Sequence, residues 1–351
     1  MTKTNPGNFF EDFSLGQELV HATPRTVTEG DVSLYTALYG FRHMPHSAEP
    51  YAMELGFEAM PLDDMLAFHM VFGKTVPDVS LNAVANLGYA AGRFGAPVYP
   101  GDTVRTTSTV IGLKENSNGK TGVVYVNSVG VNQKDEVVLD YVRWVMVKKK
   151  NLDAPTPEAV IPELPKVVDV DDLVIAEGLD FSKYDCELAG SPHLWEDYEV
   201  GEKIDHIDGM TIEEAEHQMA TRLYQNTAKV HFDQFAAKDN RFGKRLIYGG
   251  HIISLARGLS FNGLGNAFKV AAINAGAHAN PTFSGNTIFA WSEVLDKQEI
   301  KGRSDMGALR LRLVATKDQP TEGFPYKGED GKYSPDVVLD LDYWVLMPRR
   351  G

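Results

Sequence analysis

Phe10-Glu-Asp-Phe13, followed by Leu15-Gly16, recurs as Trp195-Glu-Asp-Tyr198, followed by Val200-Gly201, at an offset of 185 positions. The same offset relates further pairs along the chain, in unbroken order. An ordered series of matches at one period is the signature of an internal repeat. The pairs include Thr26-Val27 with Thr211-Ile212, Leu38-Tyr39 with Leu223-Tyr224, His46 with His231, and Gly73 with Gly258.

The offset changes only where the sequence is typical of loops. Pro97-Val-Tyr-Pro-Gly-Asp-Thr-Val104 matches Pro281-Thr-Phe-Ser-Gly-Asn-Thr-Ile288 at an offset of 184, and Val137-Val-Leu-Asp140 matches Val337-Val-Leu-Asp340 at 200. The added positions fall in Lys317 to Lys332, which is rich in glycine, proline and charge. The chain is therefore predicted to be a diverged tandem repeat with an enlarged loop in its second copy.

The repeat sets the domain boundaries. Residues 1–148 form one half and residues 195–351 the other, and 351 residues are enough for two domains. Residues 149–194 carry five prolines and many acidic residues, so we expect a linker that wraps the surface.

Composition narrows the functional classes. The formal net charge of −14 disfavours nucleic-acid binding by bulk electrostatics. No apolar run is long enough for a membrane span, and the N-terminal sequence lacks the features of a secretory signal. One cysteine, Cys186, fits a reducing cytoplasm, where we expect the protein. The sequence contains no glycine-rich phosphate-binding loop and no cysteine and histidine spacing typical of a zinc site. Neither a cofactor nor a metal is therefore expected.

Each half follows one plan of predicted elements. An opening helix (Glu29–Tyr39; Glu213–Gln225) precedes an apolar helical run, which in the second half is His251–Phe261. Long strands follow. This order predicts an α+β fold in which an antiparallel sheet wraps a helix in each half, with the two halves side by side as a pseudo-dimer. The strands are predicted at Thr103–Leu113, Gly122–Val131, Glu136–Val147, Ala308–Val314 and Val337–Met347.

Several strings resemble those of mesaconyl-CoA hydratases, which are double-hotdog members of the MaoC-like (R)-specific enoyl-CoA hydratase group. The resemblance spans nearly the whole chain, and it implies an acyl-CoA substrate. The implied reaction is the reversible addition of water to mesaconyl-C1-CoA to give β-methylmalyl-CoA, within C2 assimilation or autotrophic carbon pathways. The strings are Asn5-Pro-Gly-Asn-Phe-Phe-Glu-Asp-Phe13, His21-Ala-Thr-Pro-Arg25, Phe72-Gly-Lys-Thr-Val-Pro-Asp78, Leu87-Gly-Tyr89 and Tyr224-Gln-Asn-Thr-Ala-Lys-Val-His-Phe232.

The broader group carries the signature Gly-Asp-x-Asn-Pro-x-His, whose aspartate and histidine flank the substrate double bond. The resemblance places this histidine on His231 and the aspartate position on Asn226. In the first half the two positions are His46 and Phe41, and phenylalanine cannot hold a water. We therefore expect only the second half to be catalytic, while the first half shapes the acyl-CoA tunnel.

Hydration of a conjugated thioester needs a proton carrier and a positioned water. An imidazole titrating near pH ~6.5 suits the first role, which we assign to His231. Asn226 can orient a water but cannot accept its proton. Each residue also has an ordinary alternative: a packed or surface histidine, and an asparagine that ends a helix.

The reaction also needs a site for the thioester oxygen as negative charge develops. Tyr248-Gly249-Gly250-His251 precedes the apolar helix, and the first N–H groups of a helix are free donors. We predict that the Gly250 N–H polarises the carbonyl, although the stretch could be a simple turn. The matching Asp63-Asp64-Met65 of the first half would repel an enolate. His278 could line the pocket or be an ordinary packed histidine.

A free carboxylate and the CoA phosphates call for cations. Arginine suits carboxylates and lysine suits phosphates, although each such residue alone is more often a solvated surface charge. The candidates clustered around the motif are Lys229, Arg222, Arg241, Lys244 and Arg245.

Three rival readings remain open. A hotdog thioesterase would need a carboxylate to activate water, and Asp233 is the nearest acid to the motif. A different (R)-specific enoyl-CoA hydratase or dehydratase would share the fold. A non-catalytic acyl-CoA-binding module would need neither half to be active. Oligomeric state is also open, because exposed sheet edges could pair two chains.

Overall fold

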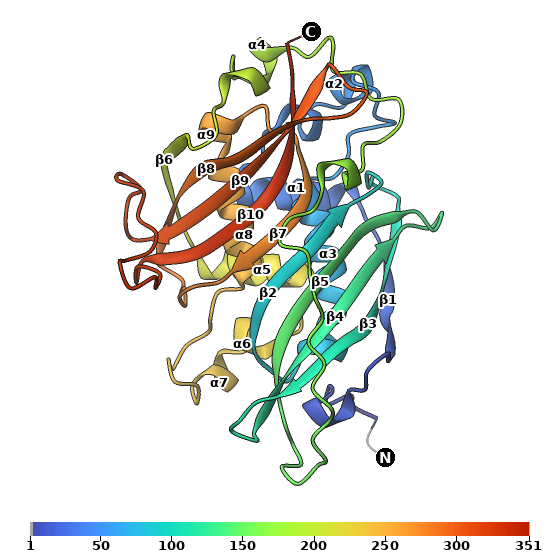
Figure 1. The fold of residues 1–351 in the computed structure, drawn as a ribbon, viewed down its shortest axis with the longest axis vertical. Helices are drawn as coiled ribbons and strands as arrows, with labels where there is room; N and C mark the ends of the chain where they lie inside the picture. The colour runs from blue at the N-terminus through green and yellow to red at the C-terminus, as the bar shows by residue number, and fades with distance from the viewer. Residues whose placement is uncertain (1–2, 351) are drawn as a thin grey trace.

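The computed structural model describes residues 3–350 and contains one ten-stranded antiparallel sheet (Figure 1). The strand order is β1-β3-β4-β5-β2-β7-β10-β9-β8-β6, so the second half repeats the first in mirror order. The first half supplies β1 (Glu18–Thr26), β2 (Ala83–Phe94), β3 (Thr103–Glu115), β4 (Thr121–Val131) and β5 (Val137–Lys148). The second half supplies β6 (Lys203–Thr211), β7 (Lys269–Ala277), β8 (Thr287–Glu299), β9 (Met306–Lys317) and β10 (Val337–Pro348).

The two halves join through β2 and β7, which pair at Ala90 with Ala275 and at Gly92 with Ile273. Because all strand pairs are antiparallel and the order is mirrored, the halves are related by a pseudo-twofold axis near this junction. The predicted α+β fold, with two hotdog halves arranged as a pseudo-dimer, is confirmed.

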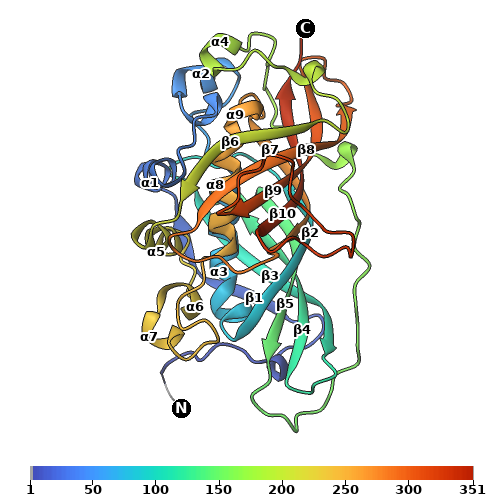
Figure 2. The same ribbon diagram turned by 90° about the vertical axis from the view of Figure 1, so that its left-hand side faces the viewer.

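The long helices cover one face of the sheet (Figure 2). Those of the first half are α1 (Glu29–Tyr39) and α3 (Asp64–Thr75), and those of the second half are α5 (Glu214–Leu223) and α8 (Gly249–Leu259). The short helices are α2 (Glu49–Glu54), α4 (Cys186–Ala189), α6 (Lys229–Phe232), α7 (Gln234–Ala237) and α9 (Phe261–Leu264). Among the described residues, no helix has the length and apolarity needed to cross a bilayer.

Three predicted helix boundaries differ from the structure by two residues, one of them the end of α8 at Leu259, before the predicted Phe261. Helix α8 begins at Gly249, before the predicted His251, because periodicity of apolar side chains cannot detect the two glycines of its first turn. Helix α5 ends at Leu223, before the predicted Gln225, which has a φ of 54°. This left-handed residue turns the chain towards Asn226.

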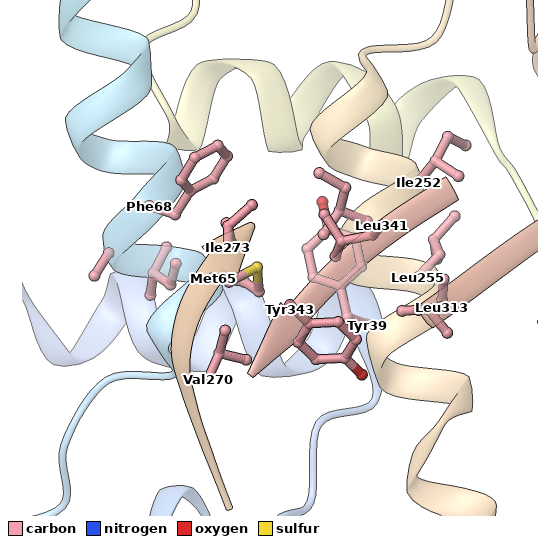
Figure 3. Packing of buried hydrophobic residues seen from close by; sticks show 14 of the residues in the cluster. Tyr39, Met65, Phe68, Ile252, Leu255, Val270, Ile273, Leu313, Leu341 and Tyr343 are labelled. Atoms are coloured by element: carbon pink, nitrogen blue, oxygen red, sulfur yellow. The ribbon is translucent and has the colours of Figure 1, made fainter. Parts of the chain in front are cut away.

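The main core lies between the sheet and the helices α3 and α8 (Figure 3). Met65 and Phe68 of α3 lie on one side, and Ile252 and Leu255 of α8 lie on the other. Strands β9 and β10 pack against α8, and β7 contacts α3. This shared core makes the two halves one packed unit.

The linker, residues 149–194, crosses the outer face of the sheet (Figures 1 and 2). Its Val160 bridges to Leu113 of β3. Further along, the Val168 N–H donates to Asn274 Oδ1 (2.8 Å) and its carbonyl accepts from Trp344 Nε1 (2.9 Å). The linker therefore follows a defined path that is tied to both halves.

Equivalent residues of the two halves meet at the pseudo-twofold axis. The Tyr224 hydroxyl donates to the Tyr39 hydroxyl (2.6 Å), and these two tyrosines are one repeat apart. Equivalent backbone contacts also form at this axis. Gly73 of α3 lies against the carbonyl of Tyr224, and Gly258 of α8 lies against the carbonyl of Tyr39. The repeated glycines exist because a Cβ at either site would overlap a carbonyl oxygen of the other half.

We predict that Gly258→Ala lowers the free energy of unfolding by about 1–3 kcal/mol, because the new methyl group displaces the Tyr39 carbonyl. Gly30→Ala is the matched control. Gly30 lies in α1, where a Cβ meets only ordinary contact with Thr28, so this change should be neutral or stabilising. Urea unfolding of both variants measures the difference, and equal stabilities would contradict this account of the interface.

Candidate active site

A pocket of about 320 Å³ lies between the two halves. The second half contributes the loop after α5 and the start of α8, and the first half contributes the end of α3 and strands β2 and β5. His231, Asn226, Tyr248, Gly249 and Arg241 all line it. The structure thus brings five of the predicted site residues to one cavity.

His231 lies in the short helix α6 and is partly buried. Its Nδ1 is 3.0 Å from the carbonyl oxygen of Leu246. A carbonyl can only accept, so Nδ1 carries the hydrogen and Nε2 is left with a free lone pair. Burial lowers the pKa of His231 to about 4, although the Leu246 bond acts in the opposite direction. The ring is therefore neutral at pH 7 and ready to accept a proton at Nε2.

Asn226 is buried at the pocket wall, and a local turn holds it there. Its backbone N–H donates to the Thr221 carbonyl (2.9 Å), and its Oδ1 accepts from the Ala228 N–H (3.0 Å). Among the described residues its side-chain nitrogen has no hydrogen-bond acceptor. The free –NH₂ group can therefore donate to a water in the pocket.

The start of α8 supplies free backbone donors. Tyr248 is the residue before the helix, and its own N–H is bound to His217 Nε2 (2.9 Å). The N–H groups of Gly249 and Gly250 have no acceptor within residues 3–350. Gly249 lines the pocket, whereas Gly250 is buried one residue further into the helix and does not. Burial raises the pKa of Tyr248 well above its ordinary value, so this hydroxyl stays protonated.

His278, which follows β7, lines the pocket opposite the helix start. Its Nε2 is 3.1 Å from the Tyr89 hydroxyl, and its buried Nδ1 has no partner. Burial, together with charge on His231, lowers the pKa of His278 to about 4. A Cβ on Gly249 would overlap the His278 ring, so the glycine allows the two walls to approach each other.

Only one of the predicted basic residues, Arg241, lines this pocket. Arg222 and Lys229 are exposed and point to no described cavity. Lys244 lies over the Phe283 ring, at 4.1 Å, and Arg245 forms an ion pair with Glu214 (3.2 Å). Lys244 and Arg245 border a separate small cavity beside His217, so the predicted cations do not converge on the pocket of His231.

The equivalent positions of the first half are closed. His46 has both ring nitrogens against carbonyl oxygens, Nδ1 against Pro61 (3.1 Å) and Nε2 against Phe268 (2.8 Å). Phe41 is buried and stacks on Tyr35. Asp64 forms an ion pair with Lys269 (3.0 Å) and also accepts from the Val270 N–H. No nitrogen of His46 is left to accept a proton from water.

Asp233, the acid that a thioesterase would use, caps α7 by accepting from the Ala236 N–H (3.0 Å) and does not line the pocket. Within the described residues, no group of three histidine, cysteine or acidic side chains is placed to hold a metal ion.

The first half also contributes polar groups that the sequence reasoning missed. Arg143 on β5 and Ser80 and Asn86 near β2 line the pocket. A signal for Arg143 was present, because it is the one charge in the apolar run Tyr141-Val-Arg-Trp-Val-Met-Val147. A charge at an inward strand position is rarely buried unless it has a function.

Comparisons with known proteins agree with this architecture. A crystal structure described as a MaoC domain dehydratase, from Chloroflexus aurantiacus, aligns over 100% of both chains with a TM-score of 0.98 and 66% identity. A Mycobacterium tuberculosis protein with a double hotdog fold aligns over 98% of this chain and 99% of its own, with a TM-score of 0.79. At 22% identity the second likeness supports the fold alone. The chain thus has the fold of the MaoC-like double hotdog proteins.

The sequence comparisons narrow this class further. The beta-methylmalyl-CoA dehydratase of Chloroflexus aurantiacus is 66% identical over 349 residues, which cover 99% of both chains. The mesaconyl-CoA hydratase of Cereibacter sphaeroides is 62% identical, over 99% of this chain and 100% of the relative. The profile of the mesaconyl-CoA hydratase family matches residues 1–328. The chain belongs to the mesaconyl-CoA hydratase family.

Proposed function

We propose that this chain catalyses the reversible hydration of mesaconyl-C1-CoA to β-methylmalyl-CoA, with His231 as general base and general acid. One observation carries the assignment: His231 presents a free Nε2 to the pocket, while both nitrogens of His46 are occupied by carbonyl groups. Family membership supplies the substrate and the reaction class.

The first step of hydration uses the neutral imidazole. Nε2 of His231 takes a proton from a water, and the water oxygen bonds to the carbon next to the free carboxylate. The Asn226 –NH₂ group donates to that water and fixes its position. Because the Nδ1 hydrogen bond fixes both tautomer and ring orientation, the base needs no rearrangement before it acts.

Electron density then moves to the thioester oxygen. In our proposal the free N–H groups at the start of α8 hold this oxygen, where the positive end of the helix dipole also acts. Gly249 joins Gly250 as a donor, since Gly249 is the one that lines the pocket. The imidazolium of His231 completes the reaction by delivering its proton to the α-carbon. Dehydration runs through the same steps in reverse.

An asparagine at position 226 fits a dicarboxylic substrate. An aspartate about 4 Å from the substrate carboxylate would cost a few kcal/mol in a partly polar site. Asparagine removes this repulsion, and His231 is left as the proton carrier. This feature favours mesaconyl-CoA over an uncharged enoyl-CoA as the substrate.

We expect His231→Gln to lower kcat by roughly 10²–10⁴-fold, because the proton carrier is lost. His46→Gln is the matched control and should retain most of the activity, since its ring serves only as a packing and hydrogen-bonding group. The assay follows the enoyl-thioester absorbance of mesaconyl-CoA and the mass of the hydrated product. Release of free CoA thiol by the wild-type protein would instead indicate a thioesterase, and full activity of His231→Gln would contradict the proposal.

Asn226→Asp tests the electrostatic argument. The added charge should weaken turnover of mesaconyl-CoA about 10-fold or more while affecting crotonyl-CoA, which has no free carboxylate, far less. Steady-state kinetics on both substrates gives the ratio. Equal losses on the two substrates would show that repulsion is not the reason for the asparagine.

A further inference from the structure

Arg143 is a fully buried arginine on the wall of the same pocket. It occupies an inward position of β5, between Tyr141 and Val145, and its guanidinium lies 4.4 Å from the centre of the Phe72 ring. The partners of its terminal nitrogens are all neutral oxygens. They are Thr75 Oγ1 at 2.7 Å, Ser80 Oγ at 3.3 Å and Asn86 Oδ1 at 3.5 Å.

No carboxylate pairs with Arg143 within residues 3–350, and its Nε–H has no acceptor. A buried charge without a counter-ion costs several kcal/mol of stability. Charged side chains are almost never fully buried unless they are paired, and an anion bound in the pocket would supply the missing partner of Arg143. The chain carries a net charge of −14, so an anionic acyl group also needs a local cation to enter.

The repeat provides an internal comparison. The second-half positions that match Phe72 and Arg143 are Arg257 and Tyr343, so the arginine and the aromatic residue are exchanged. Arg257 is bound by His43 Nε2, by the Ala267 carbonyl and by Ser260, and it does not line the pocket. Arg257 resembles Arg143 in having no carboxylate partner within residues 3–350 and an Nε–H without an acceptor. Of these two buried arginines, only Arg143 borders the cavity that contains His231.

A wall of aromatic rings connects Arg143 to the catalytic histidine. The Phe72 ring, which contacts Arg143, is 5.7 Å from the Tyr248 ring, and Tyr248 is 5.5 Å from His231. An acyl group bound along this wall with its thioester at the start of α8 would point its other end towards Arg143. In mesaconyl-C1-CoA that other end is the free carboxylate, which is bonded to the carbon that receives the hydroxyl.

We propose that Arg143 binds the free carboxylate of the substrate and selects dicarboxylic over monocarboxylic enoyl-CoA thioesters. Arginine suits this role because its planar group can form two parallel hydrogen bonds to a carboxylate. The first half then supplies substrate specificity to the chemistry of the second half. This inference rests on the proposed reaction at His231, but it concerns a different residue and a different measurement.

The test measures ligand preference directly. Methylsuccinyl-CoA keeps the carboxylate, and 2-methylbutyryl-CoA has a methyl group in its place; both are saturated and inert to hydration. Competition against mesaconyl-C1-CoA gives an inhibition constant for each, and the ratio of the two is the preference. Turnover of mesaconyl-C1-CoA and of tiglyl-CoA, its methyl analogue, is measured alongside.

We expect Arg143→Gln to lose about 100-fold in kcat/KM on mesaconyl-C1-CoA and most of the preference for methylsuccinyl-CoA, because a charge-assisted hydrogen-bond pair is lost. Turnover of tiglyl-CoA should be nearly unchanged. Arg241→Gln is the matched control: Arg241 is an exposed arginine of the same pocket, so its loss should weaken both inhibitors equally. His231→Gln should abolish turnover of both substrates and leave the preference intact, which separates this inference from the proposed chemistry.

An unchanged preference in Arg143→Gln, or an equal loss for both inhibitors, would overturn the inference. If circular dichroism shows that Arg143→Gln does not fold, Arg143→Lys replaces it. Lysine keeps the positive charge but cannot form two parallel hydrogen bonds to a carboxylate. The preference for methylsuccinyl-CoA over 2-methylbutyryl-CoA should therefore fall about 10-fold. A wild-type preference in Arg143→Lys, with a folded protein, would equally overturn the proposal.

Discussion

A single hydrogen bond, between His231 Nδ1 and the Leu246 carbonyl, determines which nitrogen of the ring can accept a proton. The loop that carries Leu246 is itself held to α6, since the Leu246 N–H donates to the Val230 carbonyl (3.0 Å). Residues 230 and 246 lie on either side of α7, so this pair of contacts closes the loop beside the pocket. Without this constraint the imidazole could rotate or change tautomer, and the proposed base would have no fixed position relative to Asn226 and the start of α8.

The repeat explains why the pocket needs both halves. The pseudo-twofold axis brings α3 of the first half against the loop after α5 of the second half, where Gly73 meets Tyr224. The same symmetry would allow a second site at His46, but carbonyl groups and a buried phenylalanine fill it. In the proposed reaction one half supplies the proton carrier, while the other supplies an arginine that lines the shared cavity. In this account each half of the repeat contributes different residues to one shared site.

Much of this organisation follows from the sequence. The offset of 185 positions predicts the duplicated fold, because the long helices and the strands of the two halves begin within one position of that offset up to the enlarged last loop. The motif histidine, His231, and its asparagine line one pocket, as the resemblance implies, although their catalytic roles stay a prediction. Of the predicted donors, Tyr248 and Gly249 line the pocket and Gly250 lies behind them, since the sequence does not say which glycine of the pair borders the cavity.

The basic residues were the hardest to predict. Closeness to His231 in sequence selected four residues that do not line its pocket, namely Arg222, Lys229, Lys244 and Arg245. Arg143 lies 88 positions before His231 and reaches the pocket only because the two halves share one sheet. Contacts between repeats depend on the direction of the pseudo-twofold axis, and sequence spacing within one repeat does not contain that information.

The central claim, a neutral His231 with its proton on Nδ1, is tested most directly by ¹⁵N NMR of histidine-labelled protein, with His231→Gln used to assign the signal. The account predicts a protonated Nδ1 and an unprotonated Nε2 at pH 7, with titration only as the pH falls towards about 4; a proton on Nε2, or a doubly protonated ring at pH 7, would contradict it.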